Sequence, residues 1–334
     1  MVTSRDVARL AGVSQPTVSR ALRDDPRVST ETKQRIRNAA RVLGYVPSET
    51  GRALSSGRTR RVGLLLTDLE NQFYPHIIAS MHDELEAHGY QLVLHTETTD
   101  TDGVAERLVA NGLDGVILAT TTLDSLLPVR LRDRQIPFVY FNRNTPSVAA
   151  DAALVDSTRG LTEAADELVA RGHRRIAGIF GPANTSTGSW RESVLRSALL
   201  AHGIHIPAEL TVHGPFDFPT GFDGTHQLLR LQNLPTAIVC GNDVVALGAL
   251  NAAAERGVRV PDDVSILGFD DLPAASWPII QLSTVAFDLD QMARAAIRLL
   301  IARLGAEQQA PYATQVFDSR LVLRRTVGPA PVGS

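Results

Sequence analysis

The side chains most suited to chemistry near the start of the sequence lie in the stretch QPTVSRAL, residues 15–22. Val18, Ala21 and Leu22 recur at helical spacing and are expected to face inward. The side chains left outward are Gln15, Pro16, Thr17, Ser19 and Arg20. Amide, hydroxyl and guanidinium groups hydrogen-bond the edges of DNA bases, and one helix fits the major groove. The stretch therefore predicts a helix that reads DNA sequence; the alternative is an ordinary amphipathic surface helix.

Two more short helices are expected around this one. Before it, Val7, Leu10 and Ala11 share one helical face. Thr3 or Ser4 can cap that first helix, and a glycine follows its last apolar residue. The first two helices are then joined by only three or four residues, which is typical of a helix-turn-helix unit.

The third helix is expected over residues 30–45. Ser29 can cap it, as Ser14 can cap the second helix. The inward positions of the third helix are Ile36, Ala40 and Leu43. Three helices of this kind can share one small core.

Positive charge is concentrated in the same part of the chain. Residues 1–61 contain 13 Lys and Arg against 5 Asp and Glu, a formal charge of +8, whereas the whole chain carries −3. The remaining residues are therefore acidic, with a formal charge of −11. A basic segment that coincides with a predicted helix-turn-helix favours a nucleic-acid partner over a merely solvated surface.

The rest of the chain alternates short apolar runs with helical patterns, which is typical of βαβ units. The first expected strands cover residues 62–67, 91–96, 114–119 and 138–141, with a helix over 74–89. After about residue 158 the pattern begins again, with strands over 175–180, 209–214, 236–241 and 265–270. We predict two similar doubly wound subdomains with a ligand in the cleft between them, at the carboxyl ends of the strands.

Polar and aromatic side chains lie at or after the ends of several expected strands. The candidate effector-binding residues are Phe73, Tyr74, Asn142, Arg143, Arg191, Phe218, Asn242 and Asp270, with Phe216 and Trp190 as a further wall. We expect a site in which an aromatic ring stacks on a sugar-like ring while Arg191 and Asp270 bind opposite hydroxyl groups. For each residue alone, a capping or surface role is the plainer interpretation.

Motifs for catalysis or metal binding are absent from the sequence. Lys33 is the only lysine, so the acidic part has neither a P-loop lysine nor a Schiff-base lysine. His82 and His88 lie near two glutamates without the H-E-x-x-H spacing, and a solvated helix face is expected there. Cys240 is the only cysteine and is expected to be a buried small apolar residue. No cofactor and no metal is predicted.

The start of the sequence has no apolar signal-peptide region, and no run of about 18 uncharged apolar residues occurs. A single cysteine also excludes a disulfide framework. We therefore expect a cytoplasmic protein that does not span a membrane.

The stretch TSRDVARLAGVSQPTVSRAL, followed by VSTETKQRIRNAARVLGYVP, resembles the DNA-binding domain of the LacI/GalR family of bacterial transcription regulators. Later segments, among them IPFVYFNR, RGHRRIAGIFGP and VPDDVSILGFDD, are similar to that family's effector-binding core, so the resemblance covers nearly the whole chain. It implies an α/β fold: an N-terminal helix-turn-helix three-helix domain plus a two-subdomain, periplasmic-binding-protein-like core of parallel sheets.

The resemblance also implies a division of the chain and a set of DNA contacts. The helix-turn-helix domain covers 1–46, the hinge 47–60, the N-subdomain 61–158 and 288–316, and the C-subdomain 159–287 and 317–328. In the family the hinge becomes a short helix on operator DNA, and the residue matching Leu54 inserts between base pairs. Gly51 and Ser48 depart from the alanine and asparagine that are usual there. The residues expected to contact DNA are Thr3, Ser14, Gln15, Pro16, Thr17, Ser19, Arg20, Ser29, Thr32, Tyr45 and Leu54.

These observations predict a ligand-responsive, sequence-specific DNA-binding regulator, most simply a repressor controlled by a small sugar-like effector. A homodimer on double-stranded, pseudo-palindromic operator DNA is expected, with residues 244–254 and 272–280 as dimer contacts or, alternatively, intrachain core. A solute-binding protein with the same core and no DNA role is the main alternative, and an enzyme on a doubly wound fold is the second. Whether the effector releases or strengthens DNA binding stays open.

Overall fold

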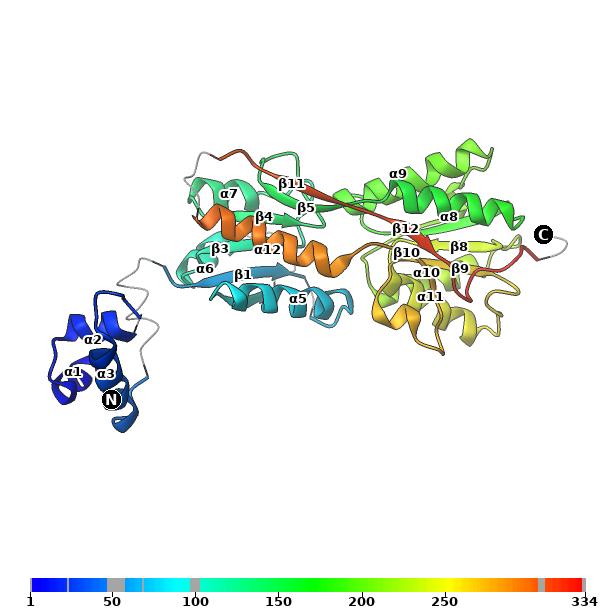
Figure 1. Ribbon diagram of the computed structural model, residues 1–334. Helices are drawn as coiled ribbons and strands as arrows, with labels where there is room; N and C mark the ends of the chain where they lie inside the picture. The colour runs from blue at the N-terminus through cyan, green and yellow to red at the C-terminus, as the bar shows by residue number, and fades with distance from the viewer. Residues whose placement is uncertain are drawn as a thin grey trace. The chain divides into compact units, whose positions relative to one another are not determined.

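The computed structural model describes residues 2–22, 24–46, 58–67, 69–96, 103–305 and 310–331 (Figure 1). The chain divides into two compact units, residues 1–59 and 60–334, and each is described by itself. Gly51 and Leu54 of the expected hinge lie outside the described residues. No helix among the described residues is long and apolar enough to cross a membrane.

The described part of the first unit contains three helices: α1 (Ser4–Ala11), α2 (Gln15–Leu22) and α3 (Thr30–Val42). Val7, Val18 and Ile36 are fully buried in its core, one from each helix, as the sequence predicts. Leu10 was expected in this core and is instead 53% exposed. Ala8 is buried in its place, because α1 packs against α2 and α3 through the side that carries Ala8.

Turns and caps fix the ends of these helices. Gly12 ends α1 with a φ of 62°, a left-handed conformation that glycine adopts at little cost. Ser29 caps α3, since its Oγ accepts a hydrogen bond from the Thr32 N–H at 3.2 Å. The tight connection between α1 and α2, together with the shared core, makes the first unit the helix-turn-helix domain that the sequence predicts.

The first sheet of the second unit has six parallel strands in the order β11-β5-β4-β3-β1-β2. They are β1 (Arg61–Leu66), β2 (Gln91–Thr96), β3 (Gly115–Leu118), β4 (Phe138–Phe141), β5 (Asp151–Asp156) and β11 (Thr314–Asp318). Helices α5 (Phe73–Ala87) and α12 (Leu289–Gly305) pack together in the core on one face. Helices α6 (Val104–Ala110) and α7 (Leu127–Asp133) form the core on the other.

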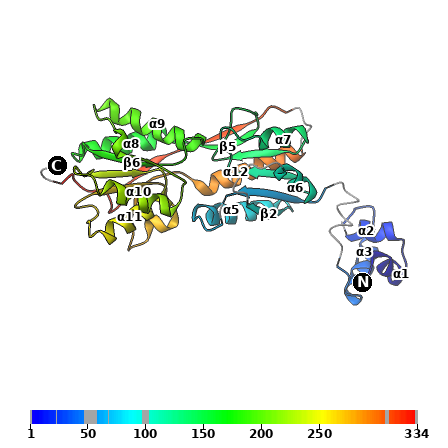
Figure 2. The ribbon, with the colours of Figure 1, turned by 180° about the vertical axis from the view of Figure 1, so that it is seen from behind.

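The second sheet repeats this plan in the order β12-β10-β9-β8-β6-β7, with only β12 antiparallel to its neighbour. Its strands are β6 (Ile176–Phe180), β7 (Thr211–His213), β8 (Ala237–Cys240), β9 (Ser265–Asp270), β10 (Ser283–Ala286) and β12 (Arg320–Val322). Helices α8 (Thr158–Ala170) and α9 (Ser186–Ala201) cover one face, and α10 (Phe218–Leu228) and α11 (Asp243–Glu255) the other (Figures 1 and 2). Both faces of each sheet are therefore buried, as is usual for parallel sheets.

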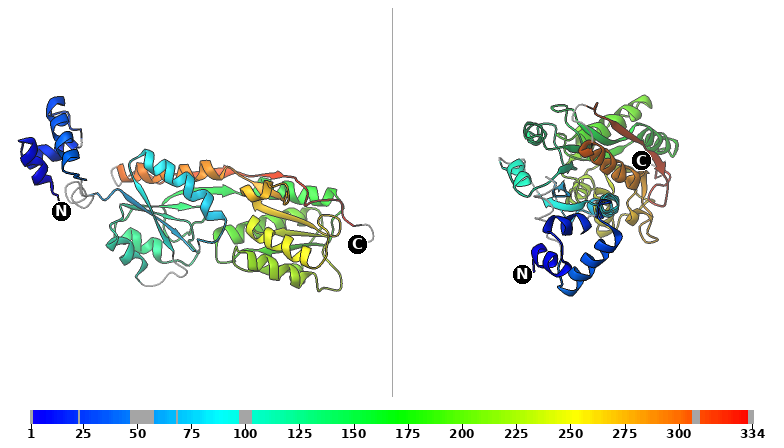
Figure 3. Two further views of the ribbon diagram at one scale, coloured as in Figure 1. Left: turned by 90° about the horizontal axis from the view of Figure 1, so that it is seen from below. Right: turned by 60° about the vertical axis from the view of Figure 1, so that its left-hand side comes forward.

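The chain passes between the two sheets three times. The crossings lie between β5 and α8, between β10 and α12, and between β11 and β12 (Figures 1 and 3). The third crossing is at Ser319. It lies beyond the expected boundary at residue 316, because β11 stays paired with β5 through Asp318. We call the part around the first sheet the N-subdomain and the part around the second sheet the C-subdomain.

Candidate functional site

The side chains of α2 that the sequence assigns to base reading lie at the surface of the first unit. Gln15, Pro16 and Arg20 are exposed, and Thr17 and Ser19 are partly buried. Gln15 is tied to α1, because its Nε2 donates to the Ser4 Oγ at 2.9 Å. Contact of Gln15 with a base edge therefore requires this bond to be shared or exchanged, whereas the Arg20 side chain is exposed.

Hydroxyl residues assigned to DNA contact lie at the starts of helices. At the start of α1, the Thr3 N–H and hydroxyl both donate to the Asp6 carboxylate, at 3.0 and 2.8 Å. At the start of α2, the Ser14 and Thr17 hydroxyls lie 2.8 Å apart. The Ser29 cap has the same place at the start of α3. Helix starts carry unpaired N–H groups that suit phosphate oxygens. These residues are therefore well placed to contact the phosphate backbone of DNA.

Three assigned DNA residues remain. Thr32 lies in the first turn of α3, and its hydroxyl accepts a hydrogen bond from the Ser29 hydroxyl at 2.9 Å. Tyr45 follows α3, is partly buried and packs against the three-helix core. Leu54 lies outside the described residues. The structure therefore gives Tyr45 a packing role, and its contact with DNA stays a prediction.

A small cavity of about 30 Å³ lies in the second unit, where strand ends of both sheets meet. Its lining is Asn71, Phe73, Tyr74, Ala119, Asn142, Arg143, Thr187, Arg191, Phe216, Asn242 and Asp270. Seven of the eight residues assigned to effector binding belong to this lining, although they are spread from residue 73 to residue 270. Asn71, Ala119, Thr187 and Phe216 complete it.

The eighth residue, Phe218, does not line the cavity. It is 41% exposed and stacks on Phe222, with ring centroids 5.9 Å apart. Since α10 begins at Phe218, the two rings lie one helical turn apart on the same face of that helix. Phe216 supplies the aromatic wall instead, and Trp190 is 52% exposed on α9.

Arg191 has the most contacts in the cavity and is only 5% exposed. Its Nη2 donates to the Asp270 Oδ1 at 3.1 Å, and its Nη1 donates to the Gly241 carbonyl at 2.8 Å. The guanidinium carbon lies 3.6 Å from the centroid of the Phe269 ring. The sequence assigned Arg191 and Asp270 to opposite hydroxyl groups of a ligand. In the structure they pair with each other, and their contact with a ligand stays a prediction.

The carboxyl groups near Arg191 have perturbed acidities. Burial raises the pKa of Asp270 to about 6, although Arg191 acts in the opposite direction. Burial and the neighbouring Asp270 raise the pKa of Asp243 well above its ordinary value. Asp243 accepts hydrogen bonds from the Thr284 hydroxyl at 2.6 Å and the Leu272 N–H at 2.7 Å. Asp270 can thus change its protonation state near neutral pH, which is a frequent property of functional sites.

Arg143 is the second cation of the cavity. Its guanidinium carbon lies 5.3 Å from the centroid of the Phe216 ring, and burial lowers its pKa. Within the described part of the chain, its side chain forms no ion pair and no hydrogen bond. Asn142 before it has a φ of 63°, and such left-handed backbone at a non-glycine residue is typical of functional sites.

Three buried polar atoms of the lining have no hydrogen-bond partner in the described structure: Asn142 Oδ1, Thr187 Oγ1 and Arg191 Nε. Buried polar atoms are nearly always paired, and an unpaired one costs about 1–3 kcal/mol. Together they offer an acceptor, a hydroxyl and a charged donor around one cavity. Their arrangement suits a ligand with several polar groups.

Three hydrogen bonds join the subdomains near the cavity. The Asn71 Nδ2 donates to the Phe216 carbonyl at 2.7 Å. The Leu123 N–H donates to the Asn184 carbonyl at 2.8 Å, and the Asn144 N–H donates to the Ser186 Oγ at 3.0 Å. The described structure is therefore a closed arrangement of the two subdomains. No sequence pattern indicates these pairs, since each joins residues far apart in the chain.

A second hollow of about 310 Å³ lies beside the cavity, and Arg143 lines both. Its lining is rich in hydroxyl and amide groups, among them Thr67, Thr120, Thr122 and Asn184. Residues of both subdomains contribute to it. The space available to a ligand next to Arg143 is therefore larger than the cavity alone.

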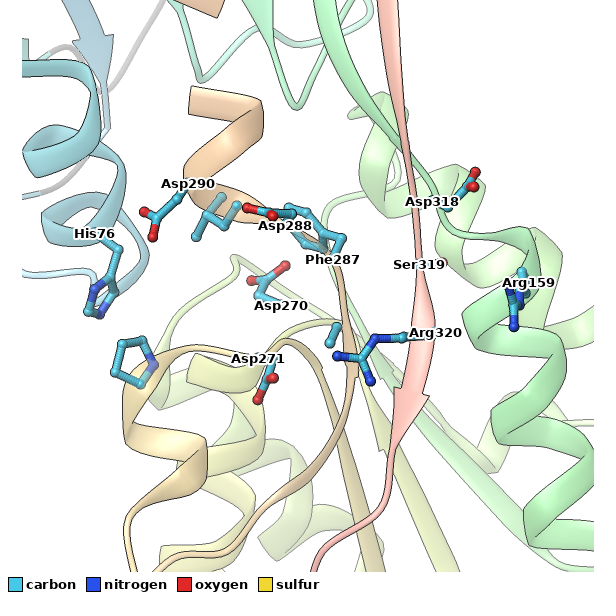
Figure 4. Close-up of a pocket in the computed structure, with 13 residues that line it drawn as sticks. His76, Arg159, Asp270, Asp271, Phe287, Asp288, Asp290, Asp318, Ser319 and Arg320 are labelled. Atoms are coloured by element: carbon cyan, nitrogen blue, oxygen red, sulfur yellow. The ribbon is translucent and has the colours of Figure 1, made fainter. Parts of the chain in front are cut away.

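A third hollow, of about 540 Å³, lies at the crossings between the subdomains. Figure 4 shows Asp270 and Asp271 on one side of it and Asp288 of the second crossing on the other, with Ser319 and Arg320 of the third crossing nearby. The shape of this hollow depends on how the subdomains are arranged, because crossing segments line it. Among the described residues, no group of three His, Cys, Asp or Glu side chains is placed to hold a metal ion.

The two apolar segments expected at a dimer contact differ in exposure. In residues 244–254, most apolar side chains are buried in the C-subdomain core. This segment is therefore part of the intrachain core, which was the alternative to a dimer contact. In residues 272–280, Trp277 is 56% exposed and Ile279 is 91% exposed. Only the second segment presents large apolar side chains for another protein chain.

Two family descriptions match this chain. Residues 3–48 match "Bacterial regulatory proteins, lacI family", and residues 165–327 match "Periplasmic binding protein-like domain". The chain is 32% identical to the HTH-type transcriptional repressor PurR of Pectobacterium carotovorum over 99% of its own length and 98% of that protein. It is also 32% identical to the probable HTH-type transcriptional repressor ExuR of Bacillus subtilis, over 91% and 92% of the two chains.

Solved structures of transcription regulators that match nearly the whole chain have the same fold. The Lac repressor dimer bound to operator and the anti-inducer ONPF matches with a TM-score of 0.86 and 26% identity, over 98% of this chain and 99% of that chain. The complex of the transcriptional regulator CelR with cellobiose matches with a TM-score of 0.72 and 30% identity, over 98% and 100%. The similarity thus covers both units of the chain.

Proposed function

This chain belongs to the LacI family and is a DNA-binding transcriptional repressor, and we propose that a small, sugar-like effector held between its subdomains controls its binding to operator DNA. It acts on double-stranded, pseudo-palindromic operator DNA as a homodimer in the cytoplasm. Neither the solute-binding alternative nor the enzyme alternative accounts for residues 3–48, which match the lacI family.

The observation that carries this proposal is the set of unpartnered polar atoms around one cavity. Asn142 belongs to the N-subdomain, whereas Thr187 and Arg191 belong to the C-subdomain. A ligand that hydrogen-bonds to all three contacts both subdomains at once. Such a ligand favours the arrangement in which the two subdomains are close, by the difference between its binding energies in the two arrangements.

Relatives with known complexes support both partners. The CelR structure contains cellobiose, and the Lac repressor structure is a dimer on operator DNA with an anti-inducer. In this chain, Phe73 and Phe216 supply aromatic surface in the cavity, and Arg191, Asn242 and Asp270 supply hydrogen-bonding groups. Aromatic and hydrogen-bonding groups of this kind suit a polyhydroxylated ring.

Control of DNA binding follows from the connection between the two units. Residues 47–60 join the first unit to the N-subdomain, so a change in the arrangement of the subdomains is transmitted through this segment. Coupling between two sites is typically about 1–3 kcal/mol, which corresponds to a 5- to 150-fold change in affinity. We propose induction, in which the effector weakens operator binding. In the alternative, corepression, the arrangement that the effector favours would be the one that binds operator DNA more tightly.

The test begins with a thermal-shift screen of sugars, polyols, nucleosides and purines against the full chain. Operator affinity is then measured with and without the best ligand, for the wild type and for Asp270→Asn. Asparagine is chosen because Asp270 has a positive φ of 117°, and asparagine tolerates positive φ better than most residues. The matched control is Asp262→Asn, since Asp262 is exposed and pairs only with the surface residue Arg259, at 3.6 Å. We expect Asp270→Asn to lose the response and keep ligand-free operator binding, and Asp262→Asn to behave as wild type. A full response in Asp270→Asn would exclude this cavity as the effector site.

A further inference from the structure

The cavity contains more positive than negative charge. Its charged lining residues are Arg143, Arg191 and Asp270. Asp270 pairs with Arg191 at 3.1 Å and acts on Arg143 only through a longer-range attraction, so one carboxyl group is shared by two guanidinium groups. A largely desolvated cation without a partner is costly, and proteins that retain one commonly use it to bind an anion.

The nearby carboxyl groups do not balance the excess of positive charge in the cavity. The pKa of Asp270 is raised to about 6 by burial, so this group loses charge when the pH falls. Asp243 lies behind Asp270 and already accepts hydrogen bonds from Thr284 and Leu272. Burial also raises its pKa well above the ordinary value. Neither carboxyl group forms an ion pair with Arg143, and the Asp270 charge that acts on Arg143 is shared with Arg191.

The backbone adds positive potential to the same cavity. Helices α5, α9 and α11 each contribute a lining residue from their first turns or N-cap: Phe73, Thr187 and Asn242. Helix N-termini carry a partial positive charge and favour anions. A second, independent observation points to a ligand at this cavity, because the Arg191 Nε is buried without a hydrogen-bond partner among the described residues and Arg191 is only 5% exposed.

We propose that the effector carries an oxyanion, a carboxylate or a phosphate group, which binds the Arg143 guanidinium. This inference rests on the proposed function, since it names the chemical class of the effector in the same cavity. The remaining polar groups of the effector bind Asn142, Thr187 and the Arg191 Nε. The hollow of about 310 Å³ on the other side of Arg143 gives the oxyanion room. A sugar acid or a sugar phosphate has this combination of hydroxyl groups and charge.

The experiment uses matched neutral and anionic probes on the full chain at constant ionic strength. The first series is glucose, glucuronate and glucose monophosphate, and the second is galactose, galacturonate and galactose monophosphate. Thermal shift and calorimetric titration measure binding, and the two anionic members of each series separate a carboxylate from a phosphate. We expect at least one oxyanion to bind while its neutral parent binds more weakly or not at all.

Variants assign the effect to Arg143. Arg143→Gln is expected to weaken binding of the oxyanion by about 10- to 150-fold, the effect of one charge-assisted hydrogen bond, and to leave a neutral parent unchanged. Arg143→Lys keeps the charge and is expected to retain part of the preference. The control is Arg230→Gln, which removes the same charge from an exposed position at the end of α10. It is expected to bind every probe as the wild type does.

The stability of the ligand-free protein gives a second readout. Among the residues that the structure describes, the Arg143 guanidinium forms no ion pair of its own, so its removal should not cost stability. We expect the melting temperature of Arg143→Gln to be equal to or above that of the wild type. A lower melting temperature would mean that Arg143 stabilises the fold, and it would overturn the inference. The inference is also overturned if no oxyanion binds better than its parent, or if Arg143→Gln weakens both equally.

The same measurements separate this inference from the proposed function. If an oxyanion binds through Arg143 but leaves operator affinity unchanged, the oxyanion site stands and control by the effector fails. If a neutral sugar changes operator affinity and Arg143→Gln responds as wild type, control by the effector stands and the oxyanion site fails.

Discussion

Replacing Ser186 by alanine removes one of the three hydrogen bonds that join the subdomains. The Asn144 N–H donates to the Ser186 Oγ at 3.0 Å, and neither residue lines the cavity. One neutral hydrogen bond contributes about 0.5–1.5 kcal/mol net. This corresponds to a factor of roughly 2 to 13 in the equilibrium between closed and open arrangements. Because the proposed effector binds the closed arrangement, its apparent affinity is expected to fall by up to this factor.

Calorimetric titration with the best ligand from the screen measures this loss. Fluorescence anisotropy with a labelled operator measures the accompanying change in DNA binding. Ser189→Ala is the matched control, because the Ser189 Oγ donates to the Thr185 carbonyl within α9, at 2.9 Å, and joins no other subdomain. The reasoning is refuted if Ser186→Ala binds the ligand as tightly as the wild type does, or if both serine variants weaken binding equally.

Arg20→Ala is expected to cost about 1–3 kcal/mol of operator binding and to relax sequence preference, whereas Thr32→Ala weakens binding to operator and random DNA alike. Competition binding at fixed salt distinguishes the two, and equal losses on both DNAs for Arg20→Ala would mean that α2 docks differently. Ile279→Glu is expected to keep the circular dichroism of the wild type and to give monomers in sedimentation at micromolar concentration, because Ile279 is 91% exposed in the single chain. An unchanged dimer would exclude this surface. The raised pKa of Asp270, about 6, means that the folded state retains a proton that the unfolded chain releases between about pH 4 and pH 6. Stability from this group is therefore present at low pH and lost as the pH rises through that window. The melting temperature of the wild type relative to Asp270→Asn should rise as the pH falls from 7 to 4, and a pH-independent difference would contradict the raised pKa.

Continuous apolar runs made most of the sheets predictable. The expected strands over 91–96, 138–141 and 265–270 coincide with β2, β4 and β9. Buried parallel strands need apolar residues on both faces, so their sequences stand out from the helices between them. The topology then places the ends of β4, β8 and β9 at one cavity, which is why residues far apart in the sequence could be assigned to one site.

Strands without an apolar run were missed. Strand β11 is the clearest case, because four of its five residues are exposed and its sequence, TQVFD, has no burial pattern. Its pairing with β5 joins residues far apart in the chain, which no local pattern encodes. Strand β10, STVA, is fully buried but too short and polar to be distinguished from a loop. Strands that lack an apolar run are therefore decided by tertiary packing.

The side-chain contacts within the site were also beyond the sequence. Phe216 and Phe218 are equally plausible by position, and only the start of α10 decides which ring lines the cavity. The sequence placed Arg191 and Asp270 in one site, and both line the same cavity, but their direct pairing depends on side-chain geometry. That Asn142 Oδ1 and Thr187 Oγ1 are buried without a hydrogen-bond partner likewise becomes visible only when the positions of all neighbouring residues are known.

The size of the cavity assigns a further role to Arg143. About 30 Å³ holds roughly two water molecules, whereas small-molecule sites usually enclose about 300–1,000 Å³. The neighbouring hollow of about 310 Å³ is also lined by Arg143, so a new orientation of this side chain is expected to change the boundary between the two spaces. The hollow by itself reaches the usual range. If the proposed oxyanion draws the Arg143 guanidinium toward the hollow, we expect the rest of the effector to gain room beside the cavity.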